Sequence, residues 1–409
     1  MSDSVFHAWD RMRVPSGLRV VAENEKPLEI RPARLRAGPD IEPREWLYGT
    51  LLISRYISVL VSPGGVGKTA WSLAVGCSVA CGKGLVGDYV HRQENVLFCF
   101  LEDPEDEFDR RIAACMIRHR LDEEDLAGRV FHLNGRDRRI VVAALDGDGM
   151  TVCYPDKPAL INAIRARKIG LVVVDPFVNS HELDENSNPH INAAARAWAE
   201  IANETGCAVL LVHHTRKGAV AGDADSGRGA IALVNAARSA FTLTAMSEDE
   251  AKELGVSDDV RRLHIRLDDA KANLAPPSAK ARWYRLASIA LGNARPDYPN
   301  GDNVQAIEKW EPPDIWRDLS VADCNAALDA IAEGPGGGRR YTASRAGQGG
   351  GARWAGRVLT RMFCLNDEQA ARIIKTWVRN GVLEEGTYTD PDTRKSVSCV
   401  LVNNSRRPG

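Results

Sequence analysis

Short runs of apolar, largely β-branched residues alternate with longer segments of helical spacing along most of the chain. This alternation is typical of a parallel sheet whose strands are joined by crossover helices. Runs that are apolar at nearly every position indicate strands that are covered on both faces. On this basis we expect core strands at residues 56–61, 95–100, 170–174 and 207–212.

A second set of segments, at residues 238–244, 261–267 and 281–288, alternates between apolar and polar positions. This pattern predicts a more antiparallel continuation of the same sheet. Residues 1–45 are polar and rich in proline, which indicates an N-terminal arm or linker. We therefore expect an α/β domain with a mostly parallel central sheet at residues 46–295.

The C-terminal part predicts a different architecture. Residues 296–351 indicate a linker with one helix and a glycine-rich segment. Residues 352–409 predict two helices and a β-hairpin, which is the layout of a small winged-helix-like α+β domain. The second helix, at residues 367–380, resembles a recognition helix, and its basic residues would contact phosphates. A protein-docking domain with a solvated basic face is the alternative. The basic residues of this helix are Arg372, Lys375 and Arg379, and Arg394 and Lys395 follow the hairpin turn.

Composition is that of an ordinary globular protein, with 409 residues of which 44% are hydrophobic and 26% charged. This length suits one large domain and a smaller one. The net charge of −2 hides an asymmetry, because residues 334–409 hold 13 Lys or Arg against 6 Asp or Glu. The C-terminal end therefore carries +7 and the rest of the chain −9.

Nine cysteines are scattered along the chain without any C-x-x-C spacing, which indicates buried, reduced thiols in a reducing compartment. No apolar run approaches the ~20 residues of a membrane helix. The first residues are too polar for a signal peptide. The sequence thus predicts a cytoplasmic protein without a membrane partner.

The strongest motif lies between an apolar strand and a helical run. Its glycines let backbone amides turn toward phosphates, Lys68 would reach the β and γ oxygens, and Thr69 would ligate Mg²⁺. Ser62 stands where the general pattern has glycine, and a chance glycine-rich turn is the bland alternative. The residues expected to bind the nucleotide here are Pro63, Gly64, Gly65, Val66, Gly67, Lys68, Thr69 and Ala70.

Acidic residues follow two of the predicted core strands. Asp175 comes directly after one strand and is the candidate for the metal side of the site, and a turn cap before Pro176 is the alternative. Glu102 follows another strand and is the candidate for polarising the attacking water, with Asp103 as a second choice. A helix N-cap is the alternative, and it suits the shorter Asp103 better.

Polar side chains also end the fourth core strand. His213 or His214 could contact the γ-phosphate and report its presence, and a surface pair of histidines is the alternative. Adjacent residues on a strand point to opposite faces, so the two are poor co-ligands for a metal. Arg228 follows a glycine-rich loop and is a candidate arginine finger, or else a solvated side chain. Residues 181–185 with His190 lack the spacing of a defined metal site and indicate a polar loop.

Taken together, these motifs resemble the RepA-type hexameric replicative helicases of plasmids, a RecA-like P-loop family related to DnaB. The resemblance spans roughly residues 46–290 and does not include the two ends of the chain. It rests on the phosphate loop at 62–69, the run 101–104, Asp175, His213 with His214, the segments 228–229 and 234–238, and the block from 246 to 273.

The resemblance implies a ring, usually of six subunits, that binds ATP and Mg²⁺ at each interface and moves on single-stranded DNA. Lys68 and Thr69 would hold MgATP, Glu102 would act as base and Asp175 would stabilise the metal. One of the two histidines would sense the γ-phosphate. DnaB-like relatives carry a Lys-x-Arg pair where this chain has Lys271-Ala272-Asn273. Lys271 would still approach a neighbour's nucleotide, but Arg228 would have to supply the finger.

Two other functions are alternatives for a chain with a phosphate loop. A nucleotide-switched DNA-binding or loading protein would hydrolyse ATP slowly and never unwind DNA. A P-loop kinase would need an acceptor site and a lid, which the sequence does not suggest. We expect an ATP-dependent helicase or translocase that acts in replication of a plasmid, phage or mobile element.

Overall fold

The computed structural model describes residues 30–147, 149, 151–215, 230–276, 278, 281–313, 319–345 and 350–409. The chain divides into two compact units, residues 1–44 and 45–409. In the first unit the described residues are all exposed, and they are extended apart from the short 3-10 helix η2 (Gly38–Asp40). The second unit holds all of the other elements.

A nine-stranded sheet forms the centre of the second unit, in the order β13-β12-β11-β10-β3-β9-β8-β4-β5. The six strands from β10 to β5 are mutually parallel, and β11, β12 and β13 continue the sheet in antiparallel fashion. This confirms the predicted α/β class with its mostly parallel sheet. The strands are β3 (Ile57–Pro63), β4 (Asn95–Phe100), β5 (Val130–Asn134), β8 (Ile169–Asp175), β9 (Ala208–Thr215), β10 (Ser239–Ala245), β11 (His264–Ala272), β12 (Arg282–Ala290) and β13 (Asn303–Lys309).

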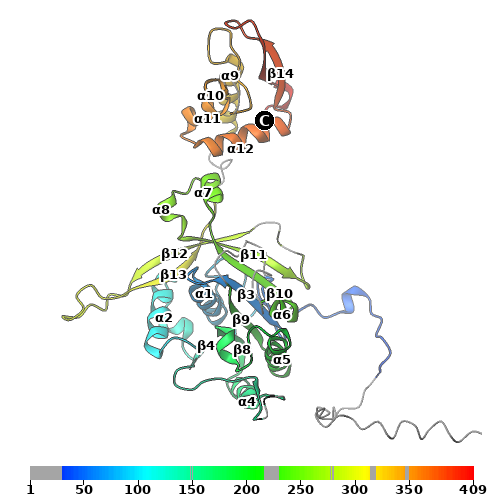
Figure 1. The fold of residues 1–409 in the computed structure, drawn as a ribbon, viewed down its shortest axis with the longest axis vertical. Coiled ribbons are helices and arrows are strands. Elements are labelled where there is room, and N and C mark those ends of the chain that lie inside the picture. The colour runs from blue at the N-terminus through cyan, green and yellow to red at the C-terminus, as the bar shows by residue number, and fades with distance from the viewer. Residues whose placement is uncertain are drawn as a thin grey trace, which may run out of the picture. The chain divides into compact units, whose positions relative to one another are not determined.

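Helices cover the parallel part of the sheet on both faces (Figure 1). Each face has its own hydrophobic core, and alternate residues of β3, β8 and β9 point into one core or the other. The core on one face contains α1 (Lys68–Cys81), α2 (Glu105–His119) and α3 (Glu123–Leu126). The core on the other face contains α4 (Lys157–Ala166), α5 (Asn188–Thr205) and α6 (Ala230–Ala236). Nearly every residue of α1 is buried, as its apolar sequence requires.

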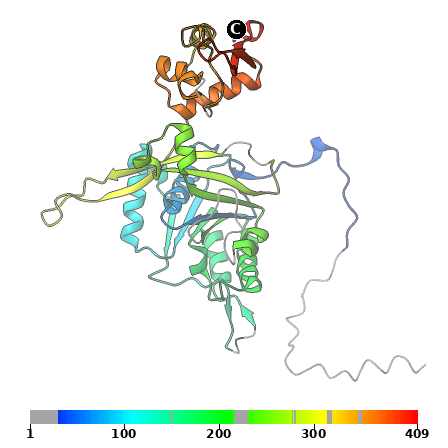
Figure 2. The same cartoon turned by 45° about the horizontal axis from the view of Figure 1, so that its top comes forward.

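The sheet differs from the sequence-based expectation at its antiparallel end. β10 runs parallel to β3, with Ser239 opposite Ser58, and the antiparallel part begins only at β11. The sequence of this segment alternates because it contains Thr242 and Thr244, yet both threonines are buried. β13 pairs with β12 along its whole length, so the expected domain end near residue 295 falls in the loop of a hairpin. Figures 1 and 2 show this β12–β13 ribbon extending past the rest of the sheet.

Several short elements connect the strands of the sheet. The 3-10 helix η3 (Phe177–Ser180) follows β8 directly, and its Ser180 Oγ accepts a hydrogen bond of 3.0 Å from Trp198 Nε1 of α5. The other short elements are β1 (Trp46–Tyr48), β2 (Leu52–Ile53), β6 (Ala144–Leu145), β7 (Val152–Cys153), α7 (Glu248–Leu254) and α8 (Asp258–Arg261).

The C-terminal residues build a separate hydrophobic core, which shares no residue with the two cores of the sheet. A three-residue turn, with Cys364 at φ 54°, joins two of its helices into a helix-turn-helix, and the β-hairpin expected from the sequence follows. Val400 N donates a hydrogen bond of 2.8 Å to Tyr341 O, which places a third segment beside the hairpin. The elements are α9 (Val321–Glu333), α10 (Gly350–Arg353), α11 (Gly356–Phe363), α12 (Asp367–Arg379), β14 (Leu383–Thr389), β15 (Ser396–Val402) and η4 (Asn404–Arg406).

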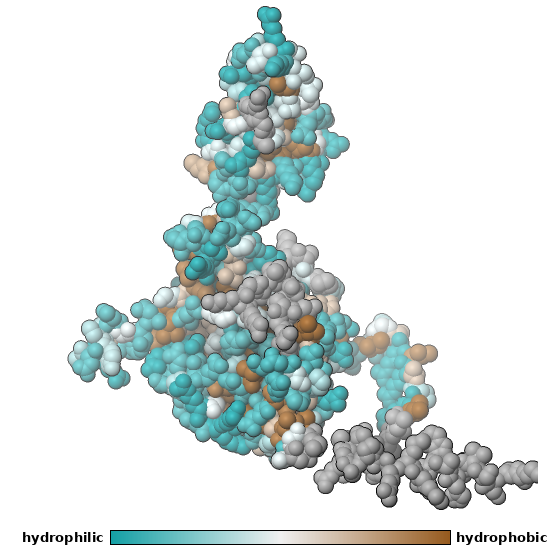
Figure 3. Space-filling model, in the orientation of Figure 1, coloured by the Kyte–Doolittle hydropathy of each residue, from teal (hydrophilic) through white to brown (hydrophobic). Residues whose placement is uncertain are grey.

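The surface is mostly hydrophilic on the face that Figure 3 shows, with hydrophobic residues in small, separate spots. Single exposed apolar side chains of this kind are normal for a folded protein. All nine cysteines are free thiols, and seven of them are buried. Among the described residues, we find no helix with the length and apolar character needed to span a bilayer.

Candidate functional site

The phosphate loop connects β3 to α1 and needs glycine for two reasons at Gly67. Its φ of 93° lies in the left-handed region, and Gly65 has φ 78°. In addition, a Cβ on Gly67 would lie 2.7 Å from Leu286 Cδ2 of β12. The antiparallel end of the sheet therefore packs directly against the loop. The backbone conformation disfavours any residue other than glycine here, and an added Cβ would also force the Leu286 side chain to shift.

Lys68 begins α1, and its side chain is only 5% exposed. The ammonium group lies inside the loop, where Nζ donates a hydrogen bond of 3.1 Å to Pro63 O. Burial lowers the pKa of Lys68, while the nearby carboxylates of Asp175 and Glu102 act in the opposite direction. The cation is thus partly desolvated and close to two acids, in the place where phosphate oxygens would meet it.

Thr69 and Asp175 meet across the edge of the sheet. Thr69 Oγ1 donates a hydrogen bond of 2.7 Å to Asp175 Oδ2, and Asp175 is only 7% exposed at the end of β8. Burial raises the pKa of this carboxyl, and the Thr69 hydrogen bond and Lys68 act to lower it. A hydroxyl and a carboxylate are the oxygen ligands that Mg²⁺ takes in P-loop sites, so the residues present suit this ion.

Glu102 emerges from β4, the strand beside β8, in which Phe100 lies opposite Asp175. Its Oε1 accepts a hydrogen bond of 3.2 Å from Asn179 Nδ2 of η3. Asp103 turns elsewhere, since its Oδ2 lies 3.1 Å from Arg111 Nη2 of α2. Of the two neighbouring acids, only Glu102 is held next to Asp175 and Lys68, and Asp103 forms an ion pair at the start of α2.

The pleat of β9 separates the two histidines. His214 has the parity of Leu210 and Val212, whose side chains pack in the core that contains α1. His213 has the parity of Val209 and Leu211, which pack in the core on the opposite face. In β8, Asp175 lies two and four residues after Val173 and Leu171, whose side chains pack in the core that contains α1, so it faces the same side. The structure therefore places His214 on the face that carries Lys68 and Asp175, and His213 on the other.

Electrostatics agree with this separation. Partial desolvation and Lys68 lower the pKa of His214, whereas Asp175 and Glu102 act to raise it, so all three groups are near its ring. Burial, followed by the proximity of His214, lowers the pKa of His213 to about 4. The His213 ring packs edge-on against the Phe177 ring, with 6.3 Å between the ring centroids. The Nδ1 atom of His213 is buried and has no hydrogen-bond partner among the described residues.

His181 differs from the polar loop residue that the sequence suggests. Its side chain is 4% exposed and packs against the Phe177 ring, with 4.9 Å between the ring centroids. Burial lowers the pKa of His181 to about 4. Its Nδ1 accepts a hydrogen bond of 3.2 Å from Leu183 N. No group of three or more potential metal ligands occurs in the part of the chain that the structure describes. His181 is therefore part of the packing behind the phosphate site.

The sequence offers two candidates for the subunit interface, of which the structure describes only Lys271. Arg228 lies outside the described residues. Lys271 of β11 lies opposite Ala240 of β10, which in turn lies opposite Val59 near the start of β3. It is therefore toward the end of the sheet away from the phosphate loop. Its Nζ donates hydrogen bonds of 3.0 and 2.9 Å to Val234 O and Asn235 O, at the end of α6.

Three residues at the site are not predicted from the sequence. Leu286 contacts Gly67, Asn179 contacts Glu102, and Arg136 Nε donates a hydrogen bond of 2.8 Å to Glu102 O. Arg136 follows β5, a strand that the apolar runs do not predict, because all five of its residues are only partly buried. Asn179 could have been found only as a polar residue shortly after a strand-end acid.

Two comparisons with known proteins concern this region. The sequence matches the AAA domain family over residues 24–220. A KaiC-like protein from the hyperthermophilic archaeon Pyrococcus horikoshii OT3 is a structural neighbour, with 14% sequence identity and a TM-score of 0.40. That alignment covers 66% of this chain and 98% of the other. The family match, the phosphate loop and the sheet that carries it identify a P-loop ATPase domain.

Proposed function

We propose that this P-loop ATPase is a DNA translocase or helicase of the RepA type, which works as a ring on single-stranded DNA. Its biological setting would be replication of a plasmid, phage or mobile element. One observation carries the proposal. The same chain joins a site suited to ATP hydrolysis to a separate helix-turn-helix module whose outer cations are available for phosphates.

At the site, the loop amides and Lys68 would bind the triphosphate, and Thr69 and Asp175 would hold Mg²⁺. The ion would neutralise charge that develops on the phosphate oxygens. Glu102 accepts a proton from the attacking water as the water oxygen bonds to the γ-phosphorus. The bond from that phosphorus to the bridging oxygen breaks, and ADP keeps the bridging oxygen. Asn179 holds the Glu102 carboxylate in place.

His214 is the histidine best placed to sense the γ-phosphate. It lies on the same face of the sheet as Lys68, and partial desolvation lowers the pKa of its imidazole, which favours the neutral form. A neutral imidazole donates one hydrogen bond without adding charge to the site. His213 then supports the end of β9 from the opposite core. Arg228 and Lys271 would act on the nucleotide of a neighbouring subunit.

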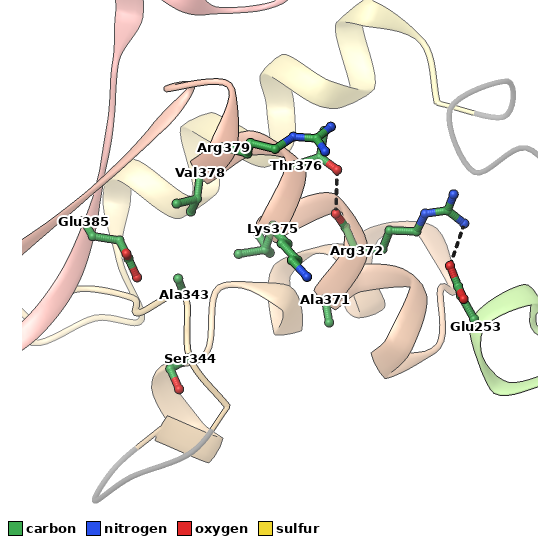
Figure 4. A pocket seen from close by; sticks show the side chains of 11 residues that line it. Glu253, Ala343, Ser344, Ala371, Arg372, Lys375, Thr376, Val378, Arg379 and Glu385 are labelled. Atoms are coloured by element: carbon green, nitrogen blue, oxygen red, sulfur yellow. Dashed lines mark hydrogen bonds and ion pairs between the residues drawn. The ribbon is translucent and has the colours of Figure 1, made fainter. Parts of the chain in front are cut away.

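The C-terminal module supplies a second contact with DNA. Its helix α12 buries Ile373, Ile374 and Trp377 and exposes the basic residues Arg372, Lys375 and Arg379. These three line a groove of about 850 Å³, and Figure 4 shows their side chains extending from the helix.

The cations of this groove differ in availability. Arg372 Nη1 lies 3.3 Å from Glu253 Oε1, whereas Lys375 and Arg379 have no acidic partner among the described residues. Arg394 and Lys395 at the hairpin tip are also exposed. Exposed cations on a helix-turn-helix and its hairpin suit the phosphates of DNA better than they suit an apolar partner.

Strand displacement coupled to ATP hydrolysis tests the proposal. The full-length chain should hydrolyse ATP faster with single-stranded DNA and should separate a forked duplex, and Lys68→Ala should abolish both activities. A nucleotide-switched loading protein would bind DNA without either response. Native mass should show a ring in the presence of DNA and a non-hydrolysable ATP analogue, and a strict monomer would contradict the shared site.

A further inference from the structure

A cleft of about 430 Å³ lies beside Glu102, on the side of the sheet where β5 ends. We propose that this cleft binds a phosphoryl oxyanion, which the guanidinium group of Arg136 holds with help from Arg139 and Asn179. The source of the anion and the stage at which it binds rest on the proposed function, and the cleft itself does not. The residues that line the cleft are Leu101, Gly135, Arg136, Arg139, Ile140 and Asn179.

The register of two parallel strands builds the cleft. Phe100 of β4 lies opposite Asn134 of β5, so the chain leaves both strands at the same edge of the sheet. Gly135 then passes so close to β4 that an added Cβ would lie 2.6 Å from Leu101 Cα. This close approach, which only glycine permits, brings the next residue, Arg136, up to Glu102.

Arg136 is held in a fixed position from two sides. Its backbone N donates a hydrogen bond of 2.9 Å to Asn134 Oδ1, and its Nε donates one of 2.8 Å to Glu102 O. These bonds leave the two terminal nitrogens of the guanidinium group for a ligand. A guanidinium group that is oriented in this way presents parallel N–H donors that match a phosphate.

The charge of Arg136 is not neutralised within the described part of the chain. Arg138 of the same loop lies 2.6 Å from Asp156, and Arg139 lies 2.8 Å from Glu182. No such carboxylate pairs with Arg136, whose side-chain bond is to a neutral carbonyl. The cleft therefore carries positive charge that an anion would compensate.

Glu102 adjoins the cleft through Asn179, which lines the cleft and donates a hydrogen bond to Glu102 Oε1. In the proposed reaction Glu102 becomes neutral when it takes a proton from water. At that stage the cleft is lined by two arginines and the carboxamide of Asn179. The negative charge near them is that of Glu182, which pairs with Arg139. An oxyanion is therefore bound best just after hydrolysis.

Two sources could supply such an anion. Inorganic phosphate is released next to Glu102 in the proposed reaction, and a backbone phosphate of single-stranded DNA would present the same oxygens. Both would use the same guanidinium contacts, so direct binding measurements must separate them.

The experiment compares Arg136→Ala with Arg138→Ala in the full-length chain. Arg138 has the same charge and belongs to the same loop, but it does not line the cleft. Binding of inorganic phosphate would be measured by titration calorimetry in the presence of MgADP. Binding of an oligothymidine of roughly 20 nucleotides would be measured by fluorescence anisotropy. Neither measurement requires hydrolysis.

We expect Arg136→Ala to weaken the binding of one of the two ligands roughly tenfold or more, because the variant loses a charge-assisted contact. A loss confined to phosphate identifies the product as the anion, and a loss confined to the oligonucleotide identifies DNA. The affinity of Arg136→Lys for that ligand should lie between those of the unaltered protein and Arg136→Ala, because lysine keeps the charge without the paired donors.

The proposal is overturned if Arg136→Ala binds both ligands as Arg138→Ala does, or if the unaltered protein binds neither. Arg139→Ala provides a second variant should Arg136→Ala fail to fold, as circular dichroism would show. A chain that binds phosphate or DNA through Arg136 but never hydrolyses ATP would contradict the proposed function and leave the oxyanion site standing.

Discussion

Thr69 Oγ1 and Asp175 Oδ2 are 2.7 Å apart although the two residues are separated by 106 positions in the chain. The contact joins the first residues of α1 to the end of β8. It brings together the two groups that would bind Mg²⁺, and it does so because β3 and β8 are parallel strands that flank β9.

Asp175→Asn should therefore raise the Mg²⁺ concentration needed for half-maximal ATP hydrolysis. The amide oxygen can still accept the Thr69 hydrogen bond, so the fold should persist while the negative ligand is lost. We expect a roughly 10- to 100-fold loss of metal affinity. Asp103→Asn is the matched control, since Asp103 pairs with Arg111, and its Mg²⁺ dependence should equal that of the unaltered chain.

Gly67→Ala should lower the thermal stability of the protein. A left-handed backbone costs a residue with a Cβ about 1–2 kcal/mol, and the new methyl would also collide with Leu286. Adding Leu286→Ala to this variant should relieve the collision but not the backbone strain. Melting curves of both single variants and the double variant would separate the two causes. A Gly67→Ala protein as stable as the original would contradict both the backbone strain and the collision with Leu286.

Stability should fall as the pH is lowered from about 6.5 toward 4. His181 and His213 have folded-state pKa values of about 4, below the ordinary value of about 6.5. Protons therefore bind the unfolded chain more strongly in this range, and each histidine contributes a slope of up to about 1.4 kcal/mol per pH unit. Above about pH 6.5 this dependence should vanish.

Urea unfolding at a series of pH values checks this expectation. The double variant His181→Gln/His213→Gln should lose part of the acid dependence, because glutamine does not titrate. His91→Gln, at an exposed position, serves as the control and should unfold with the original pH profile. An unchanged profile in the double variant would show that other groups set the acid sensitivity.

The C-terminal module should carry part of the DNA affinity. Lys375→Ala and Arg379→Ala should each weaken binding of duplex and reduce the slope of log affinity against log salt by about one. Anisotropy titrations at several salt concentrations measure both effects. Arg262→Ala removes an exposed arginine of the ATPase domain and should leave the slope unchanged. Unaltered DNA binding in the α12 variants would favour a protein partner for this module.

Arg228 can be tested by mixing subunits. Neither Arg228→Ala nor Lys68→Ala should hydrolyse ATP efficiently as a uniform ring. In a mixed ring, some interfaces combine an intact Lys68 from one subunit with an intact Arg228 from its neighbour. ATPase activity should therefore reappear on mixing, and its failure to do so would contradict a finger that acts across the interface.

What the sequence determined by itself was local. The phosphate loop is a contiguous motif between a strand and a helix, so position and content identify it together. The positions of Asp175 and Glu102 could also be predicted from the sequence. All parallel strands of a sheet end at one edge, so an acid that directly follows such a strand begins at that edge.

Tertiary structure decided the relationships that no local pattern encodes. The pleat put His214, and not His213, on the face of α1, and the ion pair with Arg111 drew Asp103 away from Glu102. The direction of β10 and the contacts of Leu286, Asn179 and Arg136 also came only from the fold. Hydrophobic periodicity records how deeply a residue is buried, whereas these contacts depend on which distant segment packs beside it.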